Sequence, residues 1–103
     1  MIDRETVEKV IFDALRNLNE ERPTNEQIKV SSETELFGGQ SSLDSLSLVS
    51  IVVDIEAEIA DLSNAEVSLT DERAMSQEIS PFNNVNTLTN YILLLLSEYG
   101  NAT

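Results

Sequence analysis

The stretch that decides the fold is "DSLSLVSIVVDIEAEI", residues 44–59, in which apolar residues recur at the spacing of one helix face. The positions expected to face the core are Leu48, Ile51, Val52, Ile55 and Ile59. A stripe of this kind is typical of an amphipathic helix that buries one side. Asp44 stands at its start, where a carboxylate can accept hydrogen bonds from the amides of the first turn. We therefore expect a helix that is capped by Asp44 and frays between 60 and 62.

The segment before this helix predicts another one. From Asp3, a candidate N-cap, apolar residues keep helical spacing to about Glu21. The helix should end there because Pro23 disfavours helical geometry in the residue before it. The long connection that follows is irregular, with room for a helical turn within 24–30.

The segment after the central helix predicts a short helix and a long one. The stretch "TDERAM" (70–75) can form one or two turns, and a last helix is expected over 85–98, capped by Asn83 or Asn84. No segment has the pattern of a sheet. We expect an all-α fold: one domain spanning 1–103, built as a small antiparallel bundle of three main helices plus one short helix.

The chain has no cysteine and no histidine, which excludes many kinds of chemistry. Disulfides, thiolate zinc sites and Ser-His relays all need one of these residues. Lysine could replace histidine as the base for a serine, but Lys9 and Lys29 are far from the serine-rich segment, and neither forms a Ser-x-x-Lys motif. We therefore do not expect a hydrolase that uses one of these serines.

The charge balance predicts the kind of partner. The 103 residues include 19 acids and 6 bases, a formal net charge of -13. This charge repels nucleic acid and anionic lipid, attracts basic protein surfaces and opposes self-association, which favours a monomer. The alternative is that the charge only maintains solubility. No run reaches the length of a membrane span and "MIDRETVEKV" has no apolar signal-peptide core, so we expect no membrane contact and a cytoplasmic location.

Ser45 differs from the neighbouring serines because it is the first helical residue after the acidic cap. Unpaired amides and the helix dipole favour an anion there. On the residues alone, a structural role at the start of the helix remains the favoured interpretation. Leu46, Val49 and Val53, however, form a second apolar strip that begins next to Ser45. A helix that is apolar over so much of its circumference is either deeply buried or binds something.

The segment "LFGGQSSLDSLSLVSIVVDIEAEI" (36–59) resembles the acyl carrier protein family, in which Asp-Ser-Leu opens the second helix after a Gly-containing loop. The stretch "SPFNNVNTLTNYI" (80–92) is similar to the family's entry into its last helix, so the resemblance covers nearly the whole chain. It implies that a phosphopantetheinyl transferase attaches phosphopantetheine from coenzyme A to Ser45. It also implies that the chain itself is not an enzyme, because the transferase and the later enzymes bring the chemistry. The thiol of that arm would carry acyl groups as thioesters to acyl-loading, ketosynthase or acyltransferase enzymes with basic patches.

The resemblance also implies a docking surface around Ser45. Its apolar contacts would be Leu46, Val49 and Val53, and its acidic contacts Asp44, Asp54, Glu56 and Glu58. Family members that serve fatty acid synthesis usually carry acids two and five residues after the modified serine, where this chain has Ser47 and Ser50. This departure favours a specialised carrier of a dedicated fatty acid, polyketide or secondary-metabolite pathway.

Three alternatives remain beside this interpretation. The chain could be an acidic helical adaptor that binds a partner without modification. A peptidyl carrier is less favoured, because such domains are usually less acidic and embedded in longer chains. Metal binding by Asp54 and Glu58 is disfavoured, because two carboxylates four residues apart on a helix usually form a solvated face.

Overall fold

Three α-helices form the framework of the protein. The computed structural model describes residues 3–36, 45–64, 67–69 and 80–101. They contain α1 (Arg4–Glu20), the 3₁₀ turn η1 (Thr24–Glu26), α2 (Ser45–Ser63) and α4 (Val85–Asn101). Within these residues no strand is found, and Glu35 and Asn84 form an isolated antiparallel bridge. The predicted all-helical fold with three main helices is therefore confirmed, whereas the short helix expected at 70–75 lies outside the described residues.

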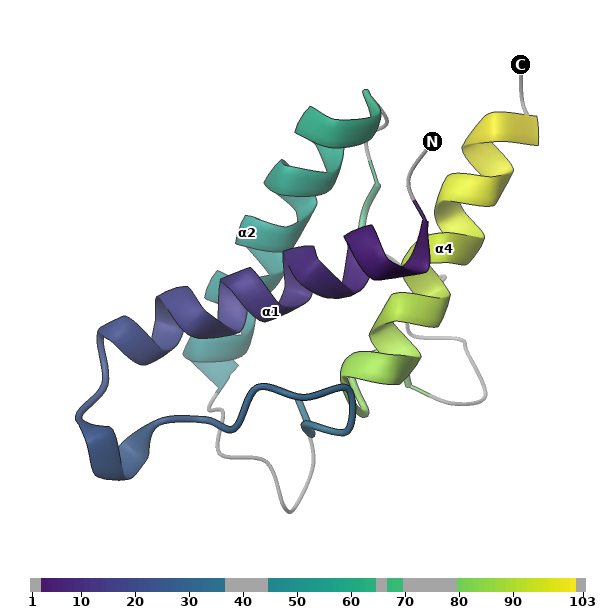
Figure 1. Cartoon of the computed structure of the whole chain (residues 1–103). Helices are drawn as coiled ribbons and strands as arrows, with labels where there is room; N and C mark the ends of the chain where they lie inside the picture. Colours follow the sequence, from purple (N-terminus) through teal and green to yellow (C-terminus); the bar gives the residue numbers. More distant parts are fainter. Residues whose placement is uncertain (1–2, 37–44, 65–66, 70–79, 102–103) are drawn as a thin grey trace.

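α1 is the central helix of the arrangement. It packs against both α2 and α4. In Figure 1, α2 and α4 both run upwards, and α1 runs across them from right to left. α2 and α4 therefore share one general direction, and α1 lies obliquely across both.

The start and end of α1 follow from its sequence. The Asp3 carboxylate accepts hydrogen bonds from the Thr6 backbone N–H (2.9 Å) and from the Thr6 hydroxyl (2.8 Å). At the other end the Glu21 N–H donates to the carbonyl of Leu18 (3.1 Å), and the helix stops before Pro23. The face between these ends buries Val7, Val10, Ile11, Ala14 and Leu15. Both predicted ends are confirmed to within one residue.

Asp3 makes the stability of α1 depend on pH. The hydrogen bonds from the Thr6 backbone and hydroxyl lower the pKa of Asp3 below its ordinary value of 3.8. Since the folded pKa is depressed, the contribution of Asp3 is present above the unfolded pKa and is lost as the pH falls through the folded pKa. Asn can cap a helix but does not titrate. We expect wild type to lose stability relative to Asp3→Asn as the pH falls from 5 to 2, a range of about one to two units either side of an ordinary Asp pKa. Urea titration at each pH measures the difference in unfolding free energy between the two. A difference in unfolding free energy that stays constant over this pH range would contradict the role of Asp3 as an ionised cap of α1.

The connection after α1 is fixed at both of its ends. The side chain of Asn19 accepts a hydrogen bond from the Ile28 N–H (2.7 Å) and donates one to the Ile28 carbonyl (2.8 Å). Further along, the carbonyls of Ser32 and Thr34 accept from the N–H groups of Asn86 and Val85, each at 3.0 Å. The first amides of a helix have no partner within the helix. The connection therefore caps α4.

Other contacts complete the N-terminal end of α4. The Asn84 side chain accepts from the Thr87 N–H (2.8 Å), which confirms Asn84 as one of the two predicted caps. Arg4, at the start of α1, donates hydrogen bonds to the side chains of Asn86 and Asn90. Residues far apart in the sequence thus hold the beginning of α4.

The core is mostly aliphatic and takes one face from each helix. The α2 stripe is confirmed: four of its five residues are buried, and Leu48 is partly buried against them. The buried apolar core positions from α2, α4 and the connections are Ile28, Leu36, Ile51, Val52, Ile55, Ile59, Val67, Leu69, Phe82, Val85, Leu88, Tyr91, Ile92 and Leu95. Thr89 is also buried, with its hydroxyl donating to the Val85 carbonyl (2.8 Å). Because the stripe fixes how α2 is rotated, Leu46, Val49 and Val53 lie on a side of the helix that faces outwards.

Candidate functional site

Ser45 is the first residue of α2. Its backbone therefore lies at the helix end where amides have no intrahelical partner. The first turn of α2 contains no acidic residue, so the positive end of the helix dipole is not neutralised from within that turn. Asp44, predicted as the cap and as a site residue, lies outside the described residues and stays a prediction.

The apolar strip is on the surface. Leu46 is 80% exposed, Val49 57% and Val53 56%, whereas Ile51 and Ile55 on the core face are 1% exposed or less. Exposed Ala57 follows four residues after Val53 and extends the same side of the helix. A helix this apolar is either deeply buried or binds something, and the exposure of these residues excludes deep burial for this side of α2.

The acids of α2 fall into two groups. Asp54 and Glu58 are exposed. Glu56 is half-buried, and its carboxylate accepts a hydrogen bond from the backbone N–H of Leu69 (2.8 Å). Leu69 itself is fully buried, so this bond fastens the 67–69 segment to α2. Glu56 thus has a structural partner within the chain, and Asp54 and Glu58 are the predicted docking acids that face solvent.

Ser47 is contacted by a basic residue that the sequence does not indicate. Arg22, just beyond the end of α1, donates from Nη2 to the Ser47 hydroxyl over 3.3 Å. The two residues are 25 positions apart, and no local pattern predicts the pair. Ser50, the other serine that departs from the family pattern, is exposed.

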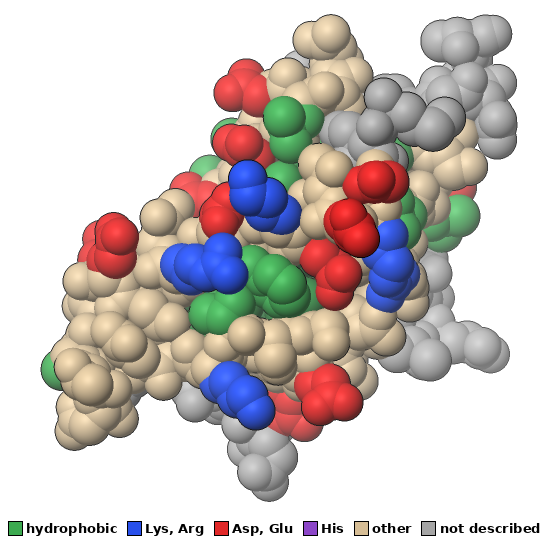
Figure 2. Space-filling model, in the orientation of Figure 1, with side chains coloured by type: hydrophobic (Ala, Val, Ile, Leu, Met, Phe, Trp, Pro, Cys, Tyr) green, Lys and Arg blue, Asp and Glu red, His purple; other side chains and the backbone are tan. Residues whose placement is uncertain are grey.

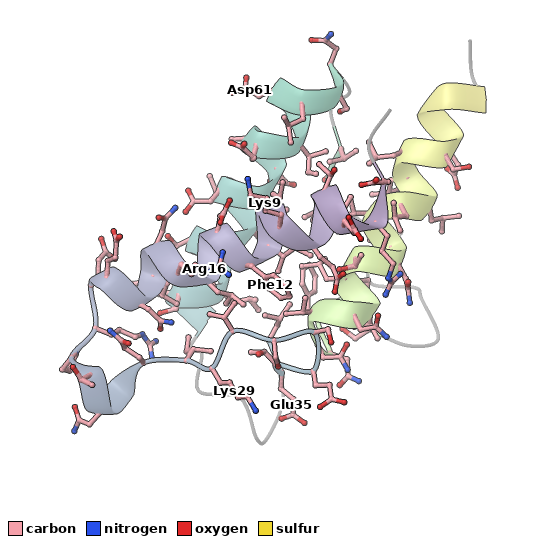
Figure 3. The ribbon with its side chains drawn as sticks, viewed as in Figure 1. Lys9, Phe12, Arg16, Lys29, Glu35 and Asp61 are labelled. Atoms are coloured by element: carbon pink, nitrogen blue, oxygen red, sulfur yellow. The ribbon has the colours of Figure 1, made fainter. Side chains whose placement is uncertain are left out.

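Charge is unevenly distributed over the helices. α2 contains four acids and no base, and α4 contains one acid and no base. Lys9 and Arg16 lie on α1, with Phe12 between them (Figure 3), and the Arg16 guanidinium is 5.9 Å from the Phe12 ring and 3.0 Å from the Asp13 carboxylate. Figure 2 shows basic and acidic side chains mixed on the face that α1 crosses. The uniformly acidic elements are therefore α2 and α4.

The described part of the chain has neither a candidate metal centre nor a helix that could span a membrane. It contains no group of three or more acidic, His or Cys side chains arranged to hold a metal ion. Its helices also include none with the length and apolar character required to cross a membrane.

Comparisons with known proteins add no functional assignment. No protein-family model matches the chain, and comparisons with curated proteins and with solved structures find no match either.

Proposed function

We propose that this chain is an acyl carrier protein that carries acyl groups on a phosphopantetheine arm attached to Ser45. The observation that supports this most is the position of Ser45 at the first residue of α2, directly before an exposed apolar strip. A carrier needs its attachment point at the surface, next to a region that partner enzymes can recognise. Ser45 begins α2, and the exposed strip of Leu46, Val49 and Val53 follows it on the same helix.

The start of α2 suits a phosphodiester. Helix N-termini favour anions through their amides and the helix dipole, and the first turn of α2 contains no acid. In this proposal the carboxylate of Asp44, the preceding residue, turns back to cap the helix and leaves room for the phosphodiester. In the attachment reaction the Ser45 oxygen forms a bond to the phosphorus of phosphopantetheine in coenzyme A. Adenosine bisphosphate leaves with the bonding electrons, and the transferase accepts the hydroxyl proton. When attached, the arm supplies the thiol that forms the acyl thioester, which this cysteine-free chain lacks.

The remaining features fit a dedicated carrier. Partner enzymes with basic patches would dock on the apolar strip and on Asp54 and Glu58. Ser47 and Ser50 distinguish the chain from carriers of general fatty acid synthesis and favour a specialised fatty acid, polyketide or secondary-metabolite pathway. The net charge of -13 supports a monomer that encounters its partners rapidly. A cytoplasmic location, where coenzyme A is available, completes the proposal.

Loading with coenzyme A tests the proposal. The purified chain is incubated with coenzyme A and a broad-specificity phosphopantetheinyl transferase, and its intact mass is measured. We expect wild type to gain the mass of one phosphopantetheine and Ser45→Ala to gain none. Ser47→Ala and Ser50→Ala are matched controls on the same helix and should gain it. No gain on wild type would reject the carrier function, and a gain on Ser45→Ala would reject the site.

An unmodified adaptor is the second candidate. It is supported by the exposure of Leu46, Val49 and Val53, which does not depend on any modification. In this case the strip would bind a basic or apolar partner surface directly. The same loading experiment distinguishes the two, because an adaptor gains no mass.

A further inference from the structure

Basic residues gather around one aromatic side chain on the face that α1 crosses. Lys9 and Arg16 lie three residues before and four residues after Phe12, so the three side chains share one side of α1. In the view of Figure 3, Lys29 of the following connection lies below Phe12, with Lys9 above it. Figure 2 shows an apolar patch at the surface here, with basic side chains above and below it. We call Lys9, Phe12, Arg16 and Lys29 the basic patch.

The cations of the basic patch are accessible to a partner. Lys9 and Lys29 are exposed, and neither makes an ion pair in the described part of the chain, although acids stand four residues before and after Lys9. The Arg16 guanidinium lies 3.0 Å from the Asp13 carboxylate, in a pair whose side chains are 59% and 52% exposed. An exposed pair of this kind contributes little to stability, so Arg16 can exchange Asp13 for a carboxylate of a partner.

Neither tertiary structure nor solubility accounts for these three bases. Arg4 donates hydrogen bonds to Asn86 and Asn90, and Arg22 donates one to Ser47, so both arginines connect distant segments. Within the described residues, the bases of the basic patch make no side-chain contact of this kind. Solubility is supported by a net charge of large magnitude, and bases reduce that magnitude in a chain with an excess of acids.

Phe12 gives the basic patch an apolar centre. It is partly buried and packs against the hydrophobic core, so part of its ring remains at the surface. The Arg16 guanidinium lies 5.9 Å from the centre of this ring, which places a cation beside the apolar surface. Aromatic residues and arginine are the types that are enriched at protein–protein interfaces, around an apolar centre with a polar rim.

We propose that the basic patch binds an acidic segment of a partner protein, in which an apolar side chain packs on Phe12 and flanking carboxylates meet the three cations. Lys9 and Arg16 are seven residues apart, or about 10 Å along the helix at 1.5 Å per residue. A helical segment with acids seven residues apart and an apolar residue between them matches this spacing. A long polyanion such as nucleic acid does not, since the net charge of -13 repels it beyond the patch.

The basic patch is separate from the surface proposed for loading. It belongs to α1 and the connection, whereas the apolar strip and the docking acids belong to α2. It carries the opposite charge and does not involve Ser45. The inference therefore holds for a carrier and for an unmodified adaptor alike, and it adds a second class of partner, one with an acidic surface.

A peptide titration followed by NMR tests the inference. The probe is a helical peptide in which two glutamates seven residues apart flank one leucine, and it is added to the isotopically labelled chain. We expect the amide shifts to concentrate in residues 9–16 and 29–30. A peptide with glutamine in place of the leucine should bind several-fold more weakly, because the contact with Phe12 is lost. Shifts of equal size along α2, or no shifts at about 1 mM peptide, would overturn the inference.

Neutralisation of the two lysines tests the cations. Lys9→Gln with Lys29→Gln removes two positive charges without breaking an ion pair between described residues. The matched control Ser68→Glu with Ser97→Glu makes the net charge more negative by the same amount, at exposed positions outside the basic patch. We expect the lysine variant to raise the Kd of the peptide about fivefold, as two exposed charge pairs predict, and the control to change it less than about twofold. Equal effects of the two variants would overturn the inference.

A second copy of the chain is the other possible occupant, because α2 itself carries acids and exposed apolar residues. Sedimentation velocity of the chain alone distinguishes the two. We expect a monomer at the concentrations used in the titration, since the net charge opposes self-association. A dimer that Lys9→Gln with Lys29→Gln dissociates would overturn the inference, because the basic patch would then bind α2 of another copy.

The loading reaction separates this inference from the proposed function. Loading at Ser45 in Lys9→Gln with Lys29→Gln should equal that of wild type, because the transferase is proposed to dock on α2. A loading defect in this variant and not in its control would overturn the separation of the two surfaces. Failure of loading in wild type would reject the carrier function, while the peptide titration would still decide whether the basic patch binds an acidic segment.

Discussion

Replacement of Val49 by aspartate is expected to lower kcat/KM for loading at Ser45 at least tenfold. Val49 is 57% exposed and lies between Leu46 and Val53 in the apolar strip. A partner that covers the strip would bury the new carboxylate without a partner for it, and each 1.4 kcal/mol of that penalty costs about a factor of ten. Initial loading rates measure the effect, and circular dichroism should show that helix content is preserved because the site faces solvent.

Leu94→Asp is the matched control for this substitution. Leu94 is also a large exposed apolar residue within a helix, 43% exposed on α4, and it is outside the proposed docking surface. We expect loading of this variant to equal that of wild type. Wild-type loading of Val49→Asp would show that the strip makes no contact with the transferase. An equal defect in both variants would indicate a general effect of added charge.

Ile55→Ala is expected to destabilise the fold by about 2 to 5 kcal/mol, the usual range for truncation of a large buried aliphatic side chain. Ile55 is fully buried, and α2 and α1 pack against each other. A loss of this size is a large share of the stability of a small domain, which is commonly about 5 to 15 kcal/mol. Urea unfolding followed by circular dichroism gives the difference in unfolding free energy.

Val53→Ala tests whether this loss is specific to the buried side of the helix. Val53 lies two residues away on the same helix and is 56% exposed. Truncation of an exposed side chain usually changes stability by no more than about 0.5 kcal/mol. A comparable loss of stability from both substitutions would contradict the placement of Ile55 in the core and of Val53 at the surface.

The helices could be predicted from the sequence because their signals are local. Asp3, the apolar spacing and Pro23 predicted α1 closely, and Asn84 was one of two predicted caps for α4. The C-terminal ends were less accurate: α2 continues to Ser63 and α4 to Asn101, each beyond the expected end. Helix ends are set by a small balance of free energy, and no Gly or Pro follows immediately after α2 to stop it.

The contacts that the sequence did not predict connect distant segments. Arg22 with Ser47, and Glu56 with the Leu69 N–H, depend on how α1 and α2 are placed in space. Burial of Thr89 also escaped prediction, because a hydroxyl that bonds to the carbonyl four residues earlier leaves no trace in the apolar pattern. The exposure of the apolar strip could not be predicted from the sequence alone, because it depends on which side of α2 packs into the core.

The beginning of α4 has a consequence for the order in which the chain folds. Its first amides are capped by the carbonyls of Ser32 and Thr34, and its side chains Asn86 and Asn90 are bound by Arg4. All three of these residues leave the ribosome before α4 does. During synthesis α1 and the following connection can therefore form a template first, onto which the last helix adds. A fragment that starts after residue 36 would lack this template, so the C-terminal helix depends on the N-terminal third of the chain for its own start.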